Sequence, residues 1–103
     1  MPDSPWDDAQ ALSAAGGNRG IVDALRGMML DELPRQRDLI DSALQRRDAS
    51  AARHELHRLR ASCGFCGATA LALSVDALYA ALAHAGDADA SEFFADVDRL
   101  LRA

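Results

Sequence analysis

Residues 50–67 read SAARHELHRLRASCGFCG, and their spacing sets the pattern for the rest of the chain. Four small or apolar residues recur every three or four positions, as on one side of a helix: Ala52, Leu56, Leu59 and Cys63. A stripe of this kind predicts a buried face. Gly67 follows the stripe, and a glycine there is typical of a helix end. We therefore expect a helix from Ser50 to about Phe65, with one buried and one exposed side.

Three further long segments repeat the helical spacing. They cover residues 18–33, the stretch that follows Pro34, and residues 68–84. Pro34 suits the first turn of a helix, so we expect a new helix to begin there. Apolar stretches near residues 9–15 and 93–101 predict a short helix at each end. The sequence therefore predicts an all-α protein, an antiparallel up-down four-helix bundle with short extra helices at its N- and C-terminal ends.

Length and composition narrow the class of protein. A chain of 103 residues has room for one domain, and we expect residues 1–103 to form it, with a loose lead-in over residues 1–6. The formal net charge of −5 argues against nucleic acid as a partner, because a phosphate backbone attracts a basic surface. No apolar run reaches the roughly 18 residues that a membrane span needs, and no signal-peptide pattern opens the chain. We expect a cytoplasmic protein without membrane insertion.

The exposed side of the predicted 50–65 helix carries residues that suit phosphoryl chemistry. His57 lies roughly 140° from the centre of the buried face. Its neighbours on the same stripe are two arginines and two minimal side chains: Arg53, Arg60, Ala61 and Gly64. A neutral imidazole is a nucleophile near neutral pH, and guanidinium groups stabilise the charge of a phosphoryl group placed on it. Because helical side chains lean towards the N-terminus, the small residues beyond His57 leave it open to a large partner.

The wider string over residues 57–68, HRLRASCGFCGA, resembles the signature of histidine phosphotransfer (HPt) domains. That family has a histidine, then a leucine, a basic residue, a small residue and a glycine at fixed distances, and the matching positions are His57, Leu59, Arg60, Ala61 and Gly67. Residues 29–34, MLDELP, are also similar to HPt domains of multi-part hybrid sensor kinases. Two positions depart from the pattern: Ala61 stands where glycine is usual, and Tyr79 replaces a frequent acid. We interpret Tyr79 as peripheral.

The resemblance implies a bundle that relays a phosphoryl group between aspartates of receiver domains through phosphorylation of His57. Arg60 would neutralise the phosphate and Arg53 would assist it. Ala61 and Gly64 would give the partner clearance, whereas Leu59 and Gly67 would serve the structure.

A carrier of this kind has no kinase or phosphatase activity and no cofactor of its own, since Mg²⁺ belongs to the partner receiver. We expect a monomer whose partners are receiver domains, either free-standing or in the cytoplasmic part of a membrane-anchored hybrid kinase.

Two other interpretations use the same residues. A helical docking module could bind or sequester a receiver without carrying phosphate. Cys63 and Cys66 have the C-x-x-C spacing of zinc and redox sites, with His54 and His57 nearby in the sequence. Cys63, however, belongs to the predicted buried face, roughly 120° from His57. We therefore expect two cysteines that fill the core, and no metal.

His54 is the second histidine of this stretch. With Glu55 and Leu56 it is similar to the H-box of dimerising histidine kinases, but no proline follows at the position that the motif requires. One turn beyond His54 lies the bulky Arg58, and we expect that side chain to block it. We interpret His54 as a surface neighbour of the reactive histidine.

Overall fold

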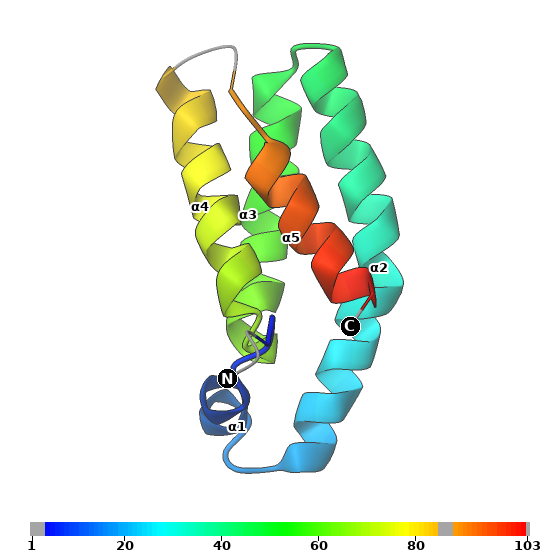
Figure 1. Cartoon of the computed structure of the whole chain (residues 1–103), viewed down its shortest axis with the longest axis vertical. Coiled ribbons are helices and arrows are strands. Elements are labelled where there is room, and N and C mark those ends of the chain that lie inside the picture. The colour runs from blue at the N-terminus through cyan, green and yellow to red at the C-terminus, as the bar shows by residue number, and fades with distance from the viewer. Residues whose placement is uncertain (1–3, 85–87, 103) are drawn as a thin grey trace.

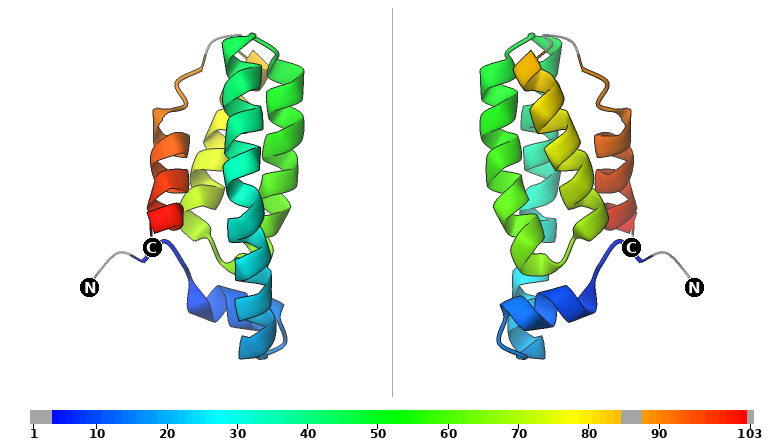
Figure 2. Two further views of the ribbon diagram at one scale, coloured as in Figure 1. Left: turned by 90° about the vertical axis from the view of Figure 1, so that its right-hand side faces the viewer. Right: turned by 90° about the vertical axis from the view of Figure 1, so that its left-hand side faces the viewer.

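A computed structural model describes residues 4–84 and 88–102, which form five α-helices (Figure 1). The helices are α1 (Asp8–Ala14), α2 (Arg19–Gln45), α3 (Ala49–Cys66), α4 (Thr69–His84) and α5 (Ser91–Arg102). Helices α2 to α5 run in alternating directions, and α1 lies crosswise below α3 and beside the lower half of α2 (Figures 1 and 2). The predicted all-α antiparallel bundle is confirmed.

Helix α2 continues through Pro34, so the predicted start of a new helix there is wrong. The proline is exposed, while the residues that α2 buries keep helical spacing on both sides of it: Val22, Met29, Leu33, Gln36, Ile40 and Ala43. Proline inside a helix costs about 3 kcal/mol, because it removes a backbone hydrogen bond and crowds the preceding turn. Burying an unbroken stripe outweighs that cost. The 27 residues of α2 therefore run the length of the molecule, whose longest extent is 41 Å (Figure 1).

With α2 unbroken, α5 is the fourth member of the bundle. It buries Phe93, Asp96, Val97 and Leu100 and packs against α4 and α2. Arg37 of α2 joins this contact, with its Nε 3.1 Å from Oδ1 of Asp98 and its guanidinium carbon 4.8 Å from the centroid of the Phe94 ring. The sequence also predicts a turn at residues 85–87, before α5, and these residues lie outside the described ones.

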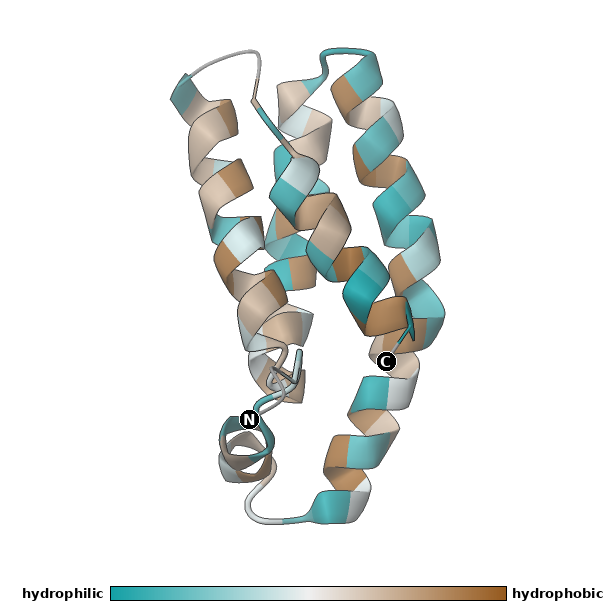
Figure 3. Ribbon diagram, viewed as in Figure 1, coloured by the Kyte–Doolittle hydropathy of each residue, from teal (hydrophilic) through white to brown (hydrophobic). Residues whose placement is uncertain are grey.

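The core lies between the four bundle helices. Its largest fully buried side chains come from each of them and include Leu33, Ile40, Leu56, Leu71 and Phe93. Apolar and polar bands alternate along α2 and α5, whereas α4 is apolar along most of its length (Figure 3). Within the described ranges, no helix combines the length and the apolar character that crossing a membrane requires.

The N-terminal segment is held against the lower end of the bundle by Arg26 of α2. Its guanidinium carbon lies 4.5 Å from the centroid of the Trp6 ring, and its Nη1 lies 2.7 Å from Oδ1 of Asp8. Its Nε also donates a hydrogen bond to the carbonyl oxygen of Cys66, at 3.0 Å. Residues 1–3 of the expected lead-in lie outside the described residues, whereas Trp6, at its end, packs against the core.

Candidate functional site

Helix α3 presents His57 to solvent from the middle of the bundle. Asp48 caps the first turn by accepting a hydrogen bond from the backbone N–H of Ala51, at 3.0 Å. One side of the helix is buried, and its residues are Ala52, Leu56, Leu59, Cys63 and Cys66. The predicted buried face is therefore confirmed, and His57 is exposed as its position on the helix predicts. Packing of the apolar side fixes the direction in which the imidazole faces.

Gly67 ends α3 in the left-handed conformation, with φ of +70°. Its carbonyl oxygen accepts a hydrogen bond from the backbone N–H of Asp7, at 2.6 Å. A Cβ at this position would collide with the Asp7 carbonyl oxygen and press on the Cβ of Ala11. Only glycine combines this φ with this close approach. The motif glycine therefore lets the N-terminal segment close over the end of α3.

Two open hollows flank His57, and it is the residue that lines both. The hollow between α3 and α4 has a volume of about 480 Å³, and its lining includes Arg53, His54, His57 and Tyr79. The hollow between α1 and α3 has a volume of about 470 Å³, and its lining residues are Ala14, His57, Arg60, Ala61, Gly64 and Phe65. The four predicted neighbours of His57 thus line the hollows on either side of its exposed imidazole.

Arg60 is ion-paired across the helix interface. Its Nε lies 2.8 Å from Oδ1 of Asp76 on α4, and both side chains are about half exposed. A pair exposed to this extent contributes little to stability, typically about 0–1 kcal/mol. Arg60 is therefore beside His57 as predicted, but a phosphate there would compete with the Asp76 carboxylate for its charge.

Arg53 is held by an aromatic ring. Its guanidinium carbon lies 4.2 Å from the centroid of the Tyr79 ring, which is within the range of a cation–π contact. The Tyr79 ring centroid is 6.4 Å from that of His57. The interpretation of Tyr79 as peripheral is therefore wrong, because this ring lies beside both Arg53 and His57.

Small side chains keep the approach to His57 open from the α1 side. Ala61 and Gly64 are both exposed, and a Cβ added to Gly64 would meet no atom within 4 Å. The backbone of Gly64 also accepts a hydrogen bond from Nε2 of Gln10 in α1, at 3.4 Å. Phe65, with 57% of its surface exposed, adds an apolar rim to the same hollow. The geometry suits a large partner with an apolar contact beside the histidine.

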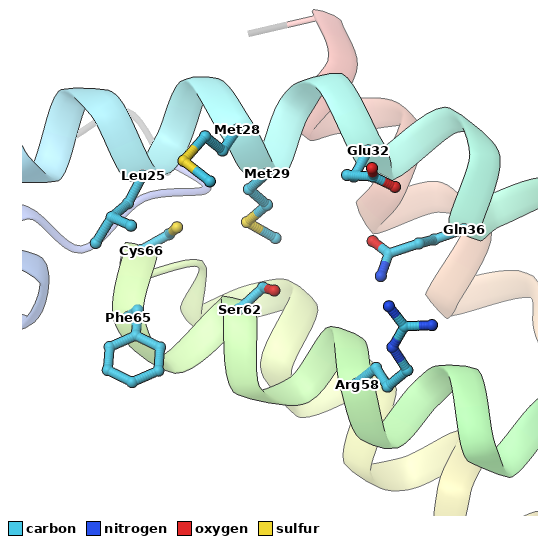
Figure 4. Close-up of a pocket in the computed structure, with 9 residues that line it drawn as sticks. All are labelled: Leu25, Met28, Met29, Glu32, Gln36, Arg58, Ser62, Phe65 and Cys66. Atoms are coloured by element: carbon cyan, nitrogen blue, oxygen red, sulfur yellow. The ribbon is translucent and has the colours of Figure 1, made fainter.

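Arg58 turns towards α2 and does not lie over His54. It lines a third hollow, of about 330 Å³ between α2 and α3, in which its guanidinium faces Gln36 (Figure 4). Nη1 of Arg58 also lies 3.5 Å from Oε1 of Glu55. The prediction that Arg58 blocks His54 is therefore wrong, and His54 lies exposed in the same hollow as His57.

The two cysteines are buried in the core, as the sequence predicts. Burial raises the pKa of the Cys63 thiol to about 12, and the neighbouring Cys66 and Asp76 act in the same direction. Burial also raises the pKa of Cys66, against the opposing charge of Arg26. Thiols that resist ionisation are poor nucleophiles and poor metal ligands. Across residues 4–84 and 88–102, no three His, Cys, Asp or Glu side chains gather closely enough to hold a metal ion.

Sequence reasoning missed the contribution of α4. Tyr79 and Asp76 are three residues apart, so they share one side of that helix and face Arg53 and Arg60 of α3. Each directly follows a buried residue, Leu78 or Val75. That position is the available signal, because residues that border a buried stripe lie against the neighbouring helix.

A family model described as Hpt domain matches residues 24–103, which is most of the chain. The matched range includes α3, α4, α5 and all but the first turn of α2, and it leaves α1 outside. No curated protein and no solved structure matches significantly.

Proposed function

Because the chain belongs to the family of Hpt domains, we propose that it carries a phosphoryl group on His57 and passes it between aspartates of receiver domains. Hpt domains serve histidine phosphotransfer in phosphorelays and interact with receiver domains. One observation supports His57 as the carrier: it is the exposed imidazole shared by two hollows, with Arg53 lining one of them and Arg60 the other.

The reaction moves a phosphoryl group without any other product. Nε2 of the neutral His57 imidazole attacks the phosphorus of an aspartyl phosphate on one receiver. An N–P bond forms, the P–O bond to the aspartate breaks, the aspartate leaves as a carboxylate, and the imidazole releases its proton to water. Transfer to the next receiver reverses each step. Phosphoryl transfer depends mainly on positioning and charge stabilisation, so a small helical domain suffices for this half of the site.

The two partners divide the work. On this chain, Arg60 and Arg53 neutralise the phosphoryl oxygens, while Ala61 and Gly64 let the receiver approach. Mg²⁺ and the acidic pocket belong to the receiver, so the chain needs no cofactor of its own. We place this relay in the cytoplasm and expect the domain to act as a monomer, free-standing or as part of a hybrid kinase.

A docking module that binds a receiver without taking phosphate is the alternative. It would use the same hollows but would not need an imidazole between two guanidinium groups. A metal or redox role for Cys63 and Cys66 fits less well, because both thiols are buried and resist ionisation.

The test is transfer of labelled phosphate from a phosphorylated receiver domain. We expect label on the chain that is labile in acid and stable in base, as for phosphohistidine, and mass spectrometry should locate it on His57. Addition of a second, unphosphorylated receiver should then remove it. A chain that binds the phosphorylated receiver but never gains label would contradict the proposal and support the docking alternative.

A further inference from the structure

The two arginines beside His57 are held in different ways. Arg60 faces the carboxylate of Asp76, with 2.8 Å between Nε and Oδ1. Arg53 faces the neutral ring of Tyr79, and within residues 4–84 and 88–102 it forms no ion pair. A carboxylate competes with phosphate for a guanidinium, whereas an aromatic ring does not. Arg53 therefore keeps its charge available to an anion.

The stack on Tyr79 also leaves the N–H groups of Arg53 free. A guanidinium is planar, and its N–H donors point outward in that plane, so a ring over the flat face does not occupy them. Nε of Arg53 is buried and has no hydrogen-bond partner among the residues that the structure describes. Buried donors are normally satisfied, so this one calls for an acceptor. A phosphoryl oxygen would supply it if the guanidinium turned its Nε towards the hollow between α3 and α4, which Arg53 lines.

Tyr79 lies against both groups that the phosphoryl chemistry needs. Its ring is 4.2 Å from the guanidinium carbon of Arg53 and 6.4 Å from the imidazole centroid of His57, to which it is inclined by 39°. Tyr79 is itself packed against the hydrophobic core, so its ring has a fixed place. One side chain of α4 thus sets the position of a guanidinium relative to the imidazole.

We propose that Tyr79 is a positioning residue that holds Arg53 as the principal contact of the phosphoryl group on His57. The phosphoryl group, a dianion, would occupy the hollow between α3 and α4, and its oxygens would accept hydrogen bonds from the edge of the guanidinium. This inference rests on the proposed function and deepens it, because it assigns the main phosphate contact to Arg53 and a supporting one to Arg60.

Phosphoramidate tests the inference without a receiver. Nε2 of His57 attacks the phosphorus of this small donor, an N–P bond to the imidazole forms, and the bond to the departing nitrogen breaks. Ammonia leaves and takes up the imidazole proton as ammonium. The protein carries His54→Gln and His84→Gln in all samples, so that His57 is the one remaining histidine of three. This background also removes the His54 imidazole, which lines the same hollow.

The readout is the midpoint of protonation of the phosphohistidine, followed by ³¹P NMR as the pH is varied, and a cation nearby disfavours protonation of both the phosphoryl oxygens and the ring. A nearby guanidinium favours the dianion and lowers the midpoint of this titration. Tyr79→Leu should raise the midpoint by about 0.2–0.7 pH unit, as expected for losing one exposed charge contact. Tyr79→Phe keeps the ring and should restore the original midpoint. In an Arg53→Gln protein, Tyr79→Leu should cause no further shift.

Phe94→Leu is the matched control, because it removes the ring beneath Arg37 on the α2–α5 side of the bundle. It should leave the midpoint unchanged. Arg53→Gln and Arg60→Gln provide a second measurement that leaves Tyr79 in place. Arg53→Gln should shift the midpoint by more than Arg60→Gln does.

Three results would overturn the inference alone: an unchanged midpoint in Tyr79→Leu, a Tyr79→Leu shift that persists without Arg53, or a larger shift from Arg60→Gln. A protein that takes no phosphate on His57 in the starting background would overturn the proposed function together with the inference.

Discussion

Along α3, one side packs into the core and the other carries His57, and the two sides differ in what a substitution would change. The five residues of the buried side are at most 2% exposed. On the exposed side, Arg60 is held by an ion pair and Arg53 by a ring contact near the surface. Substitutions on the first side should therefore lower stability, and those on the second should change chemistry. His57 is available for the proposed reaction because the core packing does not use its side chain.

The largest effect is expected from His57→Gln. Glutamine is polar and of similar size but has no nucleophilic nitrogen, so phosphorylation by a receiver should be abolished. Because His57 is exposed, the free energy of unfolding should stay within about 0.5 kcal/mol of the original. Labelled phosphate transfer and urea unfolding measure the two quantities. Label on the variant, or a large loss of stability, would contradict the division between the two sides of α3.

Leu59→Ala should show the opposite behaviour. Leu59 is 0% exposed, and truncating a buried leucine typically lowers the free energy of unfolding by about 2–5 kcal/mol. The rate of phosphotransfer per folded molecule should not change. Leu73→Ala is the control, because Leu73 is 73% exposed and its truncation in α4 should have little effect. Equal losses from the two substitutions would mean that the buried side is assigned wrongly.

The sequence predicts the parts of this structure that depend on a single helix. The spacing of Leu56, Leu59 and Cys63 is enough to place His57 on the exposed side, because a helix has a fixed rotation per residue. The expected helix start at Pro34 is wrong, because packing on both sides of the proline overrides its local preference.

The contacts of Arg53 and Arg60 could not be predicted in the same way. They depend on how α4 is rotated against α3, and one sequence gives no measure of that rotation. The motif predicts a structural role for Gly67 but not the physical reason for it. The reason is the close approach of Asp7, which is more than 50 residues away in the sequence.

Cys63→Ala should lower the free energy of unfolding by about 1–3 kcal/mol near neutral pH. It should also change the response to alkali. The folded protein raises the pKa of this thiol to about 12, whereas a thiol in an unfolded chain has a pKa of about 8.5. Between those values the unfolded state releases a proton that the folded state keeps, so stability falls as pH rises. Urea unfolding at increasing pH should show a steeper fall for the original protein than for Cys63→Ala. Parallel curves would contradict the burial of an un-ionised thiol.

Substitutions of Arg60 and Asp76 on the exposed side should change the rate of phosphorylation by smaller amounts and in opposite directions. Arg60→Gln removes a guanidinium and should slow phosphorylation of His57, whereas Asp76→Asn frees Arg60 and should speed it. Each change should be roughly 1.5- to 5-fold, because a half-exposed ion pair is worth about 0.2–1 kcal/mol. Initial rates with a phosphorylated receiver measure both. If Asp76→Asn slows the reaction as much as Arg60→Gln does, the ion pair assists catalysis and does not compete with the phosphate.

His54→Gln should have the smallest effect, a change in transfer rate of less than about 2-fold. Because Arg58 does not shield His54, the small effect of His54→Gln must come from the position of His54 on α3. His54 lines the hollow between α3 and α4 but not the hollow between α1 and α3, whereas His57 lines both. A receiver that docks over Ala61 and Gly64 would therefore place its aspartyl phosphate nearer to His57. Mass spectrometry of the phosphorylated chain should find the label on His57 alone, and the His54→Gln, His57→Gln double variant should match His57→Gln. Label on His54, or a His54→Gln variant as inactive as His57→Gln, would show that the rotation of α3 does not select the reactive histidine.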